Sequence, residues 1–339
     1  MAYFRRFLED LFLARPLLII TLGDPFSINI EGVQRVLWLR AQEKSPPMTV
    51  IVGSKRQLEG QSSGIMEDHG ISMVEDLSSL SCLPLGVYLY DIKEQGKECD
   101  PLLMTSRERG HLAFSALQSL RGFSWDGPLS VLTCPIDKKE ASEAGFSYPG
   151  QTEYFADIWQ GEALMVLKGP RLCVGLVTTH LPLSQVPMAL STDLISDKIA
   201  AFYSFLQLEK KSPKLAIAGL NPHASDNGLF GWEEAELLSP AINYHKKQGR
   251  QVEGPESADT VFFKAYHGRY DGVLCMYHDQ GLAPLKTVHF YDAVNISFGL
   301  KHLRVSPDHG PARDLYGKNQ GSLESFAEAY RICRNYLNF

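Results

Sequence analysis

The chain has 339 residues, of which 33 are Lys or Arg and 39 are Asp or Glu, so its formal net charge at pH 7 is −6. This length exceeds what one hydrophobic core usually serves, and two sub-domains are expected. The charge balance offers no basic field for a nucleic-acid backbone or an anionic membrane, so neither is an expected partner. No apolar run reaches the length of about 18 residues that a membrane span needs.

The six cysteines have no CxxC spacing, and several lie inside apolar runs, which indicates reduced thiols that pack as small hydrophobes. Reduced cysteines are typical of the cytoplasm. Near the amino terminus, Glu9, Asp10 and Arg15 interrupt the apolar stretch that a signal sequence would need. We therefore expect a short amphipathic helix there and a cytoplasmic location.

Short apolar runs alternate with segments of helical period, which predicts a mostly parallel sheet with helices on both faces. The predicted strands are Leu17 to Leu22, Met48 to Val52, Gly86 to Tyr90, Leu129 to Thr133, Leu164 to Leu167, Leu172 to Thr178, Leu215 to Gly219, Gly272 to Met276 and Ala293 to Ser297. The predicted helices are Gly32 to Gln42, His111 to Leu120, Thr192 to Leu208, Trp232 to Gln248, Thr260 to Tyr266 and Leu323 to Leu337. We place one sub-domain at residues 1–130 plus 295–339 and the other at 131–294.

Three stretches lack a clear period. Residues 54–81 and 93–101 are polar and are predicted connectors. The stretch after Met276 is interrupted by Gly281, Pro284 and further Gly and Pro residues, so it is predicted to be rich in loops. Polar, loop-rich sequence of this kind usually builds a functional site.

Three histidines each follow a predicted strand: His180 ends LCVGLVTTH, His223 ends KLAIAGLNPH and His278 ends YDGVLCMYH. In open α/β sheets ligands collect at the carboxyl ends of the strands, so the three side chains could converge. Neutral imidazoles suit a divalent metal such as Zn, Co, Ni or Mn and leave coordination positions open for a substrate. One such histidine is more often a hydrogen-bonded strand-end residue, but three in equivalent places favour a metal site.

The chain lacks the GxGxxG, P-loop, HExxH and GxSxG motifs, so a nicotinamide cofactor would not be held by a standard Rossmann turn. The segment GLNPHASDNGLFGWEE instead passes from a strand end through Asp226, Asn227 and Gly228 into a predicted helix. Small polar residues ahead of a helix leave backbone N–H groups for an anion such as a dinucleotide pyrophosphate. A plain capped turn explains the segment equally well.

The segment from 276 to 312 carries Asp279, Lys286, Asn295 and Arg304 in one continuous stretch. Lys286 and Arg304 supply cations, and arginine offers a fork suited to a carboxylate or a phosphate. A solvated basic face would carry its charges at helical spacing among other charges, which these do not. We therefore predict that at least one of them binds a ligand.

Five motifs occur in order: THLPL at 179–183, GLNPHA at 219–224, MYHDQGLAPLK at 276–286, VNISFGL at 294–300 and RVSPDHGPA at 304–312. With them the chain resembles the 4-hydroxythreonine-4-phosphate dehydrogenase (PdxA) family of pyridoxal phosphate biosynthesis. The resemblance runs from about Leu17 to the carboxyl terminus and is strong after Thr178. Several motifs in order are far more specific than any one of them.

The resemblance implies an α/β fold like that of isocitrate and isopropylmalate dehydrogenases, with two α/β/α sub-domains and the active site in the cleft at a homodimer interface. It implies NAD or NADP and one divalent metal per site (Zn, Co, Ni, Mn or Mg). The implied metal ligands, contributed by both subunits, are His180, His223 and His278. The cofactor contacts that the segment GLNPHASDNGLFGWEE suggests are Asn221, Asp226, Asn227 and Gly228. The implied substrate contacts are Gln151, Thr152, Lys286, Asn295 and Arg304, with Asp279 and Lys286 in catalytic roles.

The implied reaction oxidises 4-phosphohydroxy-L-threonine at its hydroxyl carbon and then releases carbon dioxide, which gives 3-amino-2-oxopropyl phosphate. A metal would lower the pKa of the substrate hydroxyl and stabilise the enolate that decarboxylation forms. Lys286 and Arg304 would neutralise phosphate or carboxylate, and Asp279 would orient a ligand or transfer a proton.

The chain departs from the family pattern at three places. The GHTE motif reads GQTE at 150–153, and Gln151, unlike histidine, carries no proton charge near neutral pH. The glycine-rich GDPxGIGPE stretch reads GDPFSINIE at 23–31, and TGPxxK reads TCPIDK at 133–138 with Asp137 in place of a histidine. All three lie where substrate is expected, whereas the three histidines are intact.

Three alternatives fit the same residues. The first is the same chemistry on an amino-free acid, threonate 4-phosphate or erythronate 4-phosphate. Gln151 in place of the family's histidine would explain such a change of substrate. The second is a metal-dependent hydrolase or lyase that uses no nicotinamide. The third is a metal-binding family member without dehydrogenase activity, which the altered loop at 23–31 leaves open.

Overall fold

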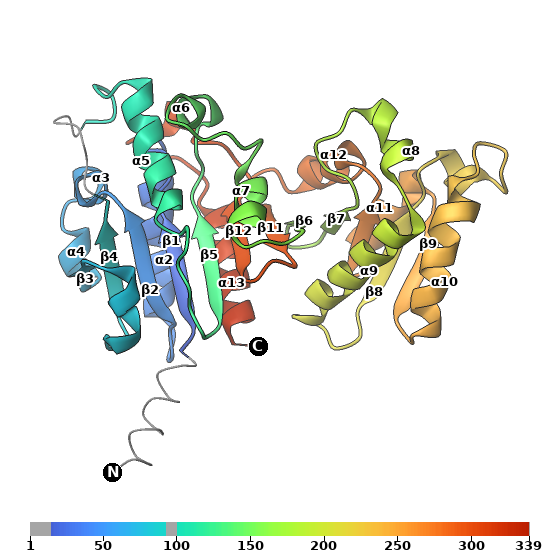
Figure 1. Cartoon of the computed structure of the whole chain (residues 1–339), viewed down its shortest axis with the longest axis horizontal. Coiled ribbons are helices and arrows are strands. Elements are labelled where there is room, and N and C mark those ends of the chain that lie inside the picture. Colours follow the sequence, from blue (N-terminus) through green and yellow to red (C-terminus); the bar gives the residue numbers. More distant parts are fainter. Residues whose placement is uncertain (1–14, 93–99, 339) are drawn as a thin grey trace, which may run out of the picture. The chain divides into compact units, whose positions relative to one another are not determined.

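The computed structural model describes residues 15–92 and 100–338, which form two compact α/β units (Figure 1). The first unit extends to Gly161 and resumes at Leu300, and the second comprises Glu162–Gly299. The predicted boundaries at 130/131 and 294/295 differ from these divisions. Residues 131–161 remain with the first unit because Tyr154 and Phe155 are buried in its core. The predicted amino-terminal helix and most of the connector at 93–101 lie outside the described residues.

The sheet of the first unit has the strand order β3-β4-β2-β1-β5-β12, and all of its pairs are parallel. Its strands are β1 (Leu17–Thr21), β2 (Met48–Gly53), β3 (Ile71–Val74), β4 (Val87–Asp91), β5 (Leu129–Thr133) and β12 (Leu303–Pro307). Its helices include α2 (Asn29–Ala41), α3 (Lys55–Gln61), α4 (Ile65–Asp68), α5 (Ser106–Gln118), α6 (Lys138–Glu143), α7 (Gln151–Ile158) and α13 (Glu324–Leu337), with short turns at Leu77–Cys82 and Arg313–Leu315.

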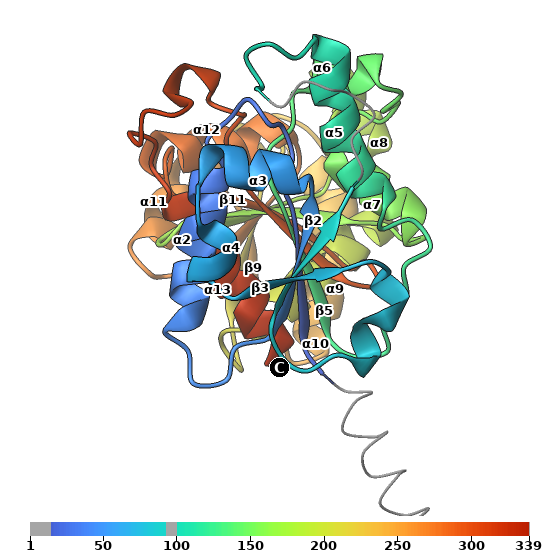
Figure 2. The same ribbon diagram turned by 90° about the vertical axis from the view of Figure 1, so that its left-hand side faces the viewer.

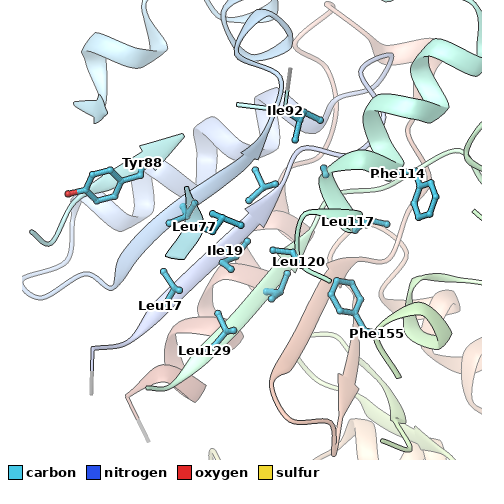
Figure 3. Packing of buried hydrophobic residues seen from close by; sticks show 14 of the residues in the cluster. Leu17, Ile19, Leu77, Tyr88, Ile92, Phe114, Leu117, Leu120, Leu129 and Phe155 are labelled. Atoms are coloured by element: carbon cyan, nitrogen blue, oxygen red, sulfur yellow. The ribbon is translucent and has the colours of Figure 1, made fainter. Parts of the chain in front are cut away.

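Helices cover both faces of this sheet, which explains why strands such as LLIIT are apolar without alternation. Figure 2 shows α5 and α7 on one side of the strands and α2 and α13 on the other. Figure 3 shows the first of these layers, where side chains from β1 and β5 pack against α5 and α7. On the opposite face, Phe326 of α13 lies against Gly32 of α2, where a Cβ would come within 2.4 Å of the phenyl ring.

The sheet of the second unit has the order β11-β6-β7-β10-β8-β9, in which β6 is antiparallel to β11 and β7 and the other pairs are parallel. Its strands are β6 (Leu164–Lys168), β7 (Cys173–Leu176), β8 (Lys214–Ala218), β9 (Gln251–Glu256), β10 (Gly272–Cys275) and β11 (Val294–Phe298). Its helices include α8 (Val186–Ala189), α9 (Thr192–Gln207), α10 (Ser239–Lys247), α11 (Ala258–Tyr266) and α12 (His278–Val288), with a π-helical turn at Glu234–Leu238 before α10.

Successive residues of β7 and β10 serve opposite faces of this second sheet. Val174 and Val273 lie in a core cluster with residues of α11 and α12. The neighbouring Gly175 and the first residue of β10, Gly272, lie against the ring of Phe202 on α9. Each unit is therefore a sheet between two helical layers, and the predicted α/β fold with two α/β/α units is confirmed.

The predicted strands and helices that fall on described residues are all present, with ends shifted by a few residues. The predicted connector at 54–81 is wrong, because it contains α3, α4 and β3. Strands β9 and β12 were also missed, and α12 occupies the start of the stretch that was predicted to be loops. Within the described ranges, no helix combines the length and the apolar character that crossing a membrane requires.

Candidate functional site

Two of the three predicted histidines lie together at the carboxyl edge of the second sheet. His180 follows β7 and His278 begins α12 directly after β10, and their ring centroids are 5.7 Å apart. The segments that lead to them are tied together, since Thr178 donates from its backbone N and its Oγ1 to the carbonyl of Met276, at 3.2 and 2.7 Å. Parallel pairing of β7 with β10 thus places this pair of imidazoles in proximity.

Asp279 is positioned to orient one of these imidazoles. Its Oδ1 lies 2.7 Å from Nδ1 of His278, and its side chain is otherwise exposed. A carboxylate at Nδ1 favours the tautomer that carries its proton there, which leaves the Nε2 lone pair available to a metal. The structure therefore gives Asp279 an orienting contact, one of the two roles that the sequence suggested.

His223 lies in a left-handed turn at the end of β8. Six consecutive residues, from His223 to Gly228, have φ values between +44° and +93°. Each non-glycine residue in this conformation costs roughly 1–2 kcal/mol, and such strain persists only where surrounding contacts over-determine the backbone. The turn leaves the His223 side chain exposed, with Phe230 as a ring neighbour at 6.3 Å between centroids.

The three histidines do not form one cluster within a single copy of the chain. Over residues 15–92 and 100–338, no group of three or more His, Cys, Asp or Glu side chains is close enough to hold a metal ion. His180 and His278 are neighbours, whereas His223 lies in the left-handed turn with its side chain exposed to solvent. The strand-end pattern alone does not predict this, because it locates the strand ends and not the course of the loops that follow them.

The predicted cofactor segment makes most of its hydrogen bonds within itself. The backbone N–H groups of Asp226, Gly228 and Leu229 bond to carbonyl oxygens of the same turn. The side-chain amide of Asn221 donates to the carboxylates of Glu233 and Glu234, at 2.8 and 2.9 Å. These particular donors are therefore engaged in holding the turn in this structure.

Lys286 and Asn295 belong to the second unit as well. Lys286 lies in α12 and is half-buried. Asn295 lies on β11, and its Oδ1 is buried without a hydrogen-bond partner among the described residues. Buried polar atoms in native structures nearly always have a partner, so this oxygen is suited to accept a hydrogen bond from a ligand.

Arg304 is a buried cation on β12 of the first unit. Only 4% of its surface is exposed, and its Nε donates to Oγ1 of Thr133 at 2.9 Å. Burial lowers the pKa of Arg304 to about 10, although the nearby carboxylates of Glu153 and Asp308 act in the opposite direction. The guanidinium therefore stays charged at neutral pH and presents a desolvated positive charge.

Gln151 and Thr152 open α7 in the same unit. The Nε2 of Gln151 donates to the carbonyl of Cys134 at 3.3 Å, which is a weak bond. Its Oε1 is buried and has no hydrogen-bond partner in the described part of the chain. An unpartnered acceptor here suits a ligand that donates an N–H or an O–H.

A network of charged side chains surrounds the loop after β1. Arg313 donates to Asp24 at 2.7 Å and also to Glu140, and Arg109 donates to Glu140 at 2.6 Å. Both guanidinium groups lie over the ring of Phe26, at 5.6 and 5.9 Å. Burial raises the pKa of Asp24 despite Arg313, whereas hydrogen bonds from the two arginines outweigh burial and lower the pKa of Glu140.

Sequence reasoning missed several of the residues that shape these sites. Arg313 and Asp24 are far apart in the chain, and no local pattern pairs them. Gln280 lies within the MYHDQGLAPLK motif, and it accepts from the N–H of Met276 and donates to the carbonyl of Gly219, at 2.7 Å each. It thereby joins the ends of β10 and β8, from which two of the histidine segments begin.

Comparison with known proteins identifies the family and agrees with this fold. The family model described as "Pyridoxal phosphate biosynthetic protein PdxA" matches residues 48–333. A 4-hydroxythreonine-4-phosphate dehydrogenase of Sulfurihydrogenibium sp. is 36% identical over 93% of this chain and 96% of that protein. A D-threonate 4-phosphate dehydrogenase of Salmonella typhimurium is 34% identical over 92% of this chain and 96% of that protein.

The fold is shared with solved members. The crystal structure of a 4-hydroxythreonine-4-phosphate dehydrogenase from Klebsiella pneumoniae superposes with a TM-score of 0.74 and 32% identity, covering 96% of this chain and 99% of that one. The chain belongs to the PdxA family, as its motifs indicated. Its relatives include dehydrogenases named for two different substrates, so membership alone does not choose between them.

Proposed function

We propose that this chain is a metal-dependent, NAD-linked dehydrogenase (NAD or NADP) of a four-carbon phosphorylated hydroxy acid, with 4-phosphohydroxy-L-threonine as the first substrate to test. The product would be 3-amino-2-oxopropyl phosphate, after decarboxylation. The observation that carries the proposal is the pair His180 and His278, whose ring centroids are 5.7 Å apart, with Asp279 against Nδ1 of His278, in a chain of the PdxA family. The related dehydrogenases support the oxidation of a phosphorylated substrate.

The histidines fit a divalent metal such as Zn, Co, Ni, Mn or Mg. When bound, a metal supplies the positive charge that acidifies a substrate hydroxyl and stabilises an enolate. The contact of Asp279 with Nδ1 of His278 leaves the second ring nitrogen, Nε2, available as a metal ligand. His223 is assigned as the third ligand.

The cationic and polar residues fit a phosphorylated acid. Arg304 carries a charge that burial has removed from water, and a dianionic phosphate or a carboxylate would compensate it. Lys286 is proposed to contact an anionic group of the substrate. The unpartnered oxygens of Asn295 and Gln151 are acceptors for the substrate hydroxyl or amino group. Thr152 is assigned as a further contact.

A second copy of the chain is proposed to complete the metal site. Exposed apolar side chains flank His180 and His223: Leu183 is 65% exposed and Met188 89%, and Leu229, on the turn that carries His223, is 71% exposed. Where exposed apolar residues form a contiguous patch, that patch commonly marks an interface. A homodimer would cover them and would bring His223 of the second copy to the pair formed by His180 and His278.

Asn221, Asp226, Asn227 and Gly228 remain the predicted contacts of the nicotinamide cofactor, and the test is a thermal shift on adding NAD or NADP. Metal binding with no shift in melting temperature on adding either nucleotide would favour a hydrolase or a lyase. The described cysteines are free thiols, which supports a cytoplasmic location as the proposed one.

The direct test is NAD reduction, followed by absorbance, in protein supplied with each metal in turn. The wild type is compared with His278→Ala and with His267→Ala, a control in which an exposed histidine of the same unit is removed. We expect turnover of 4-phosphohydroxy-L-threonine that His278→Ala abolishes and His267→Ala retains. Metal binding with no turnover of any candidate acid would refute dehydrogenase activity.

The substrate is chosen in the same assay. Turnover of threonate 4-phosphate or erythronate 4-phosphate alone would keep the chemistry and reject the first substrate. Restoring the family's histidine with Gln151→His should then shift activity towards 4-phosphohydroxy-L-threonine. If activity stays on the amino-free acids in that variant, Gln151 is not the residue that selects the substrate.

The dimer is tested separately by light scattering and by complementation. Mixed subunits of His223→Ala and His278→Ala should regain part of the activity, because one of the two sites in a mixed dimer would have all three histidines. Two inactive variants that stay inactive after mixing, in a dimer shown to exchange subunits, would contradict a site shared between copies.

A further inference from the structure

The left-handed turn at the end of β8 is unusual because most of its residues carry side chains. Its φ values are +54° at His223, +51° at Ala224, +74° at Ser225, +44° at Asp226 and +57° at Asn227. Glycine adopts this conformation readily, whereas other residues do so at a cost. A strained run of this kind needs contacts that hold it, and those contacts identify the residues that fix its shape.

Ser225 supplies the central contacts. It is 2% exposed, although its neighbours Asp226 and Asn227 are exposed. Its Oγ donates to the carbonyl of Gly231 and accepts from the N–H of Gly228 at 3.1 Å. Its own carbonyl accepts from the N–H of Phe230, also at 3.1 Å. One buried residue therefore closes the loop from its first half to its last.

A second set of contacts fixes the base of the loop. The backbone N–H of Asn221 donates to Glu234 at 2.7 Å, and the side chain of Asn221 donates to Glu233 and Glu234. Glu234 is itself buried, in the π-helical turn before α10. Asn221 precedes His223 by two residues, so its hydrogen bonds to Glu233 and Glu234 fix the start of the turn, and those of Ser225 fix its centre.

These contacts matter because the His223 side chain is exposed, so its orientation follows from the backbone that carries it. We propose that Ser225 is a positioning residue, whose side-chain hydroxyl locks the left-handed turn and so presents the His223 imidazole in the geometry that a divalent metal needs. This inference rests on the proposed function, in which His223 is a metal ligand.

The hydroxyl and the backbone strain make different predictions for two substitutions. Ser225→Ala removes the hydroxyl and keeps a Cβ in the left-handed region. Ser225→Gly removes the same hydroxyl but relieves the conformational cost. If the hydroxyl positions His223, both variants weaken metal binding. The matched control is Ser257→Ala, which removes a hydroxyl that bonds to Asp259 at 2.6 Å on another loop of the same unit.

The experiment measures Co²⁺ affinity by calorimetry and by the visible absorption of the bound ion, and amide hydrogen exchange of residues 223–231 without metal. We expect Ser225→Ala and Ser225→Gly to lose about tenfold or more in Co²⁺ affinity, as residues that support metal ligands typically do. Exchange at Gly228 and Phe230 should quicken in both variants, with melting temperatures close to that of Ser257→Ala.

The remaining outcomes separate this inference from the proposed function. Wild-type Co²⁺ affinity in both Ser225 variants, together with loss of binding in His223→Ala, would overturn the inference alone. Tighter binding in Ser225→Gly than in the wild type would also overturn it, because strain and not the hydroxyl would then control the site. Absence of Co²⁺ binding by the wild type, or full binding by His223→Ala, would overturn both. Weaker binding with faster exchange throughout the unit would show a general structural role and reject positioning.

Discussion

Glu140 is the centre of the charged network in the first unit, and its removal is the sharpest test of that network. Its side chain is 7% exposed and accepts hydrogen bonds from Arg109 and Arg313. Breaking a buried ion pair by removing one partner costs about 3–5 kcal/mol, because the remaining charge loses its compensation. Arg109 keeps its bond to the carbonyl of Pro101, and Arg313 keeps Asp24, so we expect Glu140→Ala to lose about 3 kcal/mol, the lower end of that range.

The assay is urea unfolding followed by tryptophan fluorescence, which reports mainly on the first unit because three of the four tryptophans lie in it. The control is Glu59→Ala, which removes a partner of Lys55 at 3.6 Å in a pair whose side chains are 42% and 43% exposed. Exposed pairs contribute less than about 1 kcal/mol, so this variant should stay close to the wild type.

The pH dependence provides the second readout for Glu140. Hydrogen bonds from Arg109 and Arg313 lower its pKa in the folded chain, although burial opposes them. Its stabilisation is therefore fully present above the unfolded pKa of about 4.3 and is lost as pH falls through the lower folded value. The difference in unfolding free energy between the wild type and Glu140→Ala should narrow only below a pH of about 4.3. A gap of less than about 1 kcal/mol at pH 7, or one that widens on acidification, would refute the reasoning.

Three further predictions concern packing and titration. In Gly110→Ala the new Cβ would lie 1.9 Å from the backbone oxygen of Glu140, so this variant should be recovered poorly or melt far below the wild type. The control is Gly60→Ala in helix α3, where a Cβ would have nothing within 4 Å, and this variant should be stabilised by about 0.5–1 kcal/mol. Phe202→Ala leaves a cavity beside β7 and β10 and should cost about 3–5 kcal/mol in denaturant unfolding; a loss below about 1 kcal/mol would contradict the packing described for α9. Burial lowers the pKa of His302 to about 4. The free energy of unfolding of the wild type should therefore fall by about 3 kcal/mol as pH falls from about 6.5 towards 4, whereas that of His302→Phe should not show this fall. Equal pH dependence of the unfolding free energy in the two proteins would contradict this prediction.

The sequence predicted those elements whose signal is local. Strands such as LLIIT and MTVIVG are buried at every residue because helices cover both faces of the sheet, and their mostly apolar residues alone indicate buried parallel strands. The order of the motifs indicated the family, which the comparisons confirm. His180 and His278 were also predicted as strand-end neighbours, since parallel pairing places the carboxyl ends of β7 and β10 at one edge.

Local signals were misleading where tertiary contacts outweigh propensity. Gly281 and Pro284 predicted loops, but α12 forms there because Leu282 and Leu285 are buried against the sheet and Gly281 lies close to Cys275. Strand β12 was missed because it carries Arg304, a residue that is rarely buried, and only contacts such as the bond to Thr133 stabilise it in the core.

The course of the loops was decided by the tertiary structure alone. Asp226, Asn227 and Gly228 tolerate a left-handed backbone, but a run that also includes His223, Ala224 and Ser225 does not follow from propensity, and partners such as Glu234 hold the loop. The pairing of Asp24 with Arg313 depends on the meeting of two strand ends that the chain brings together only when folded. The residue pattern thus predicted most of the strands, the family and a set of candidate site residues, whereas the direction of those side chains depends on long-range contacts.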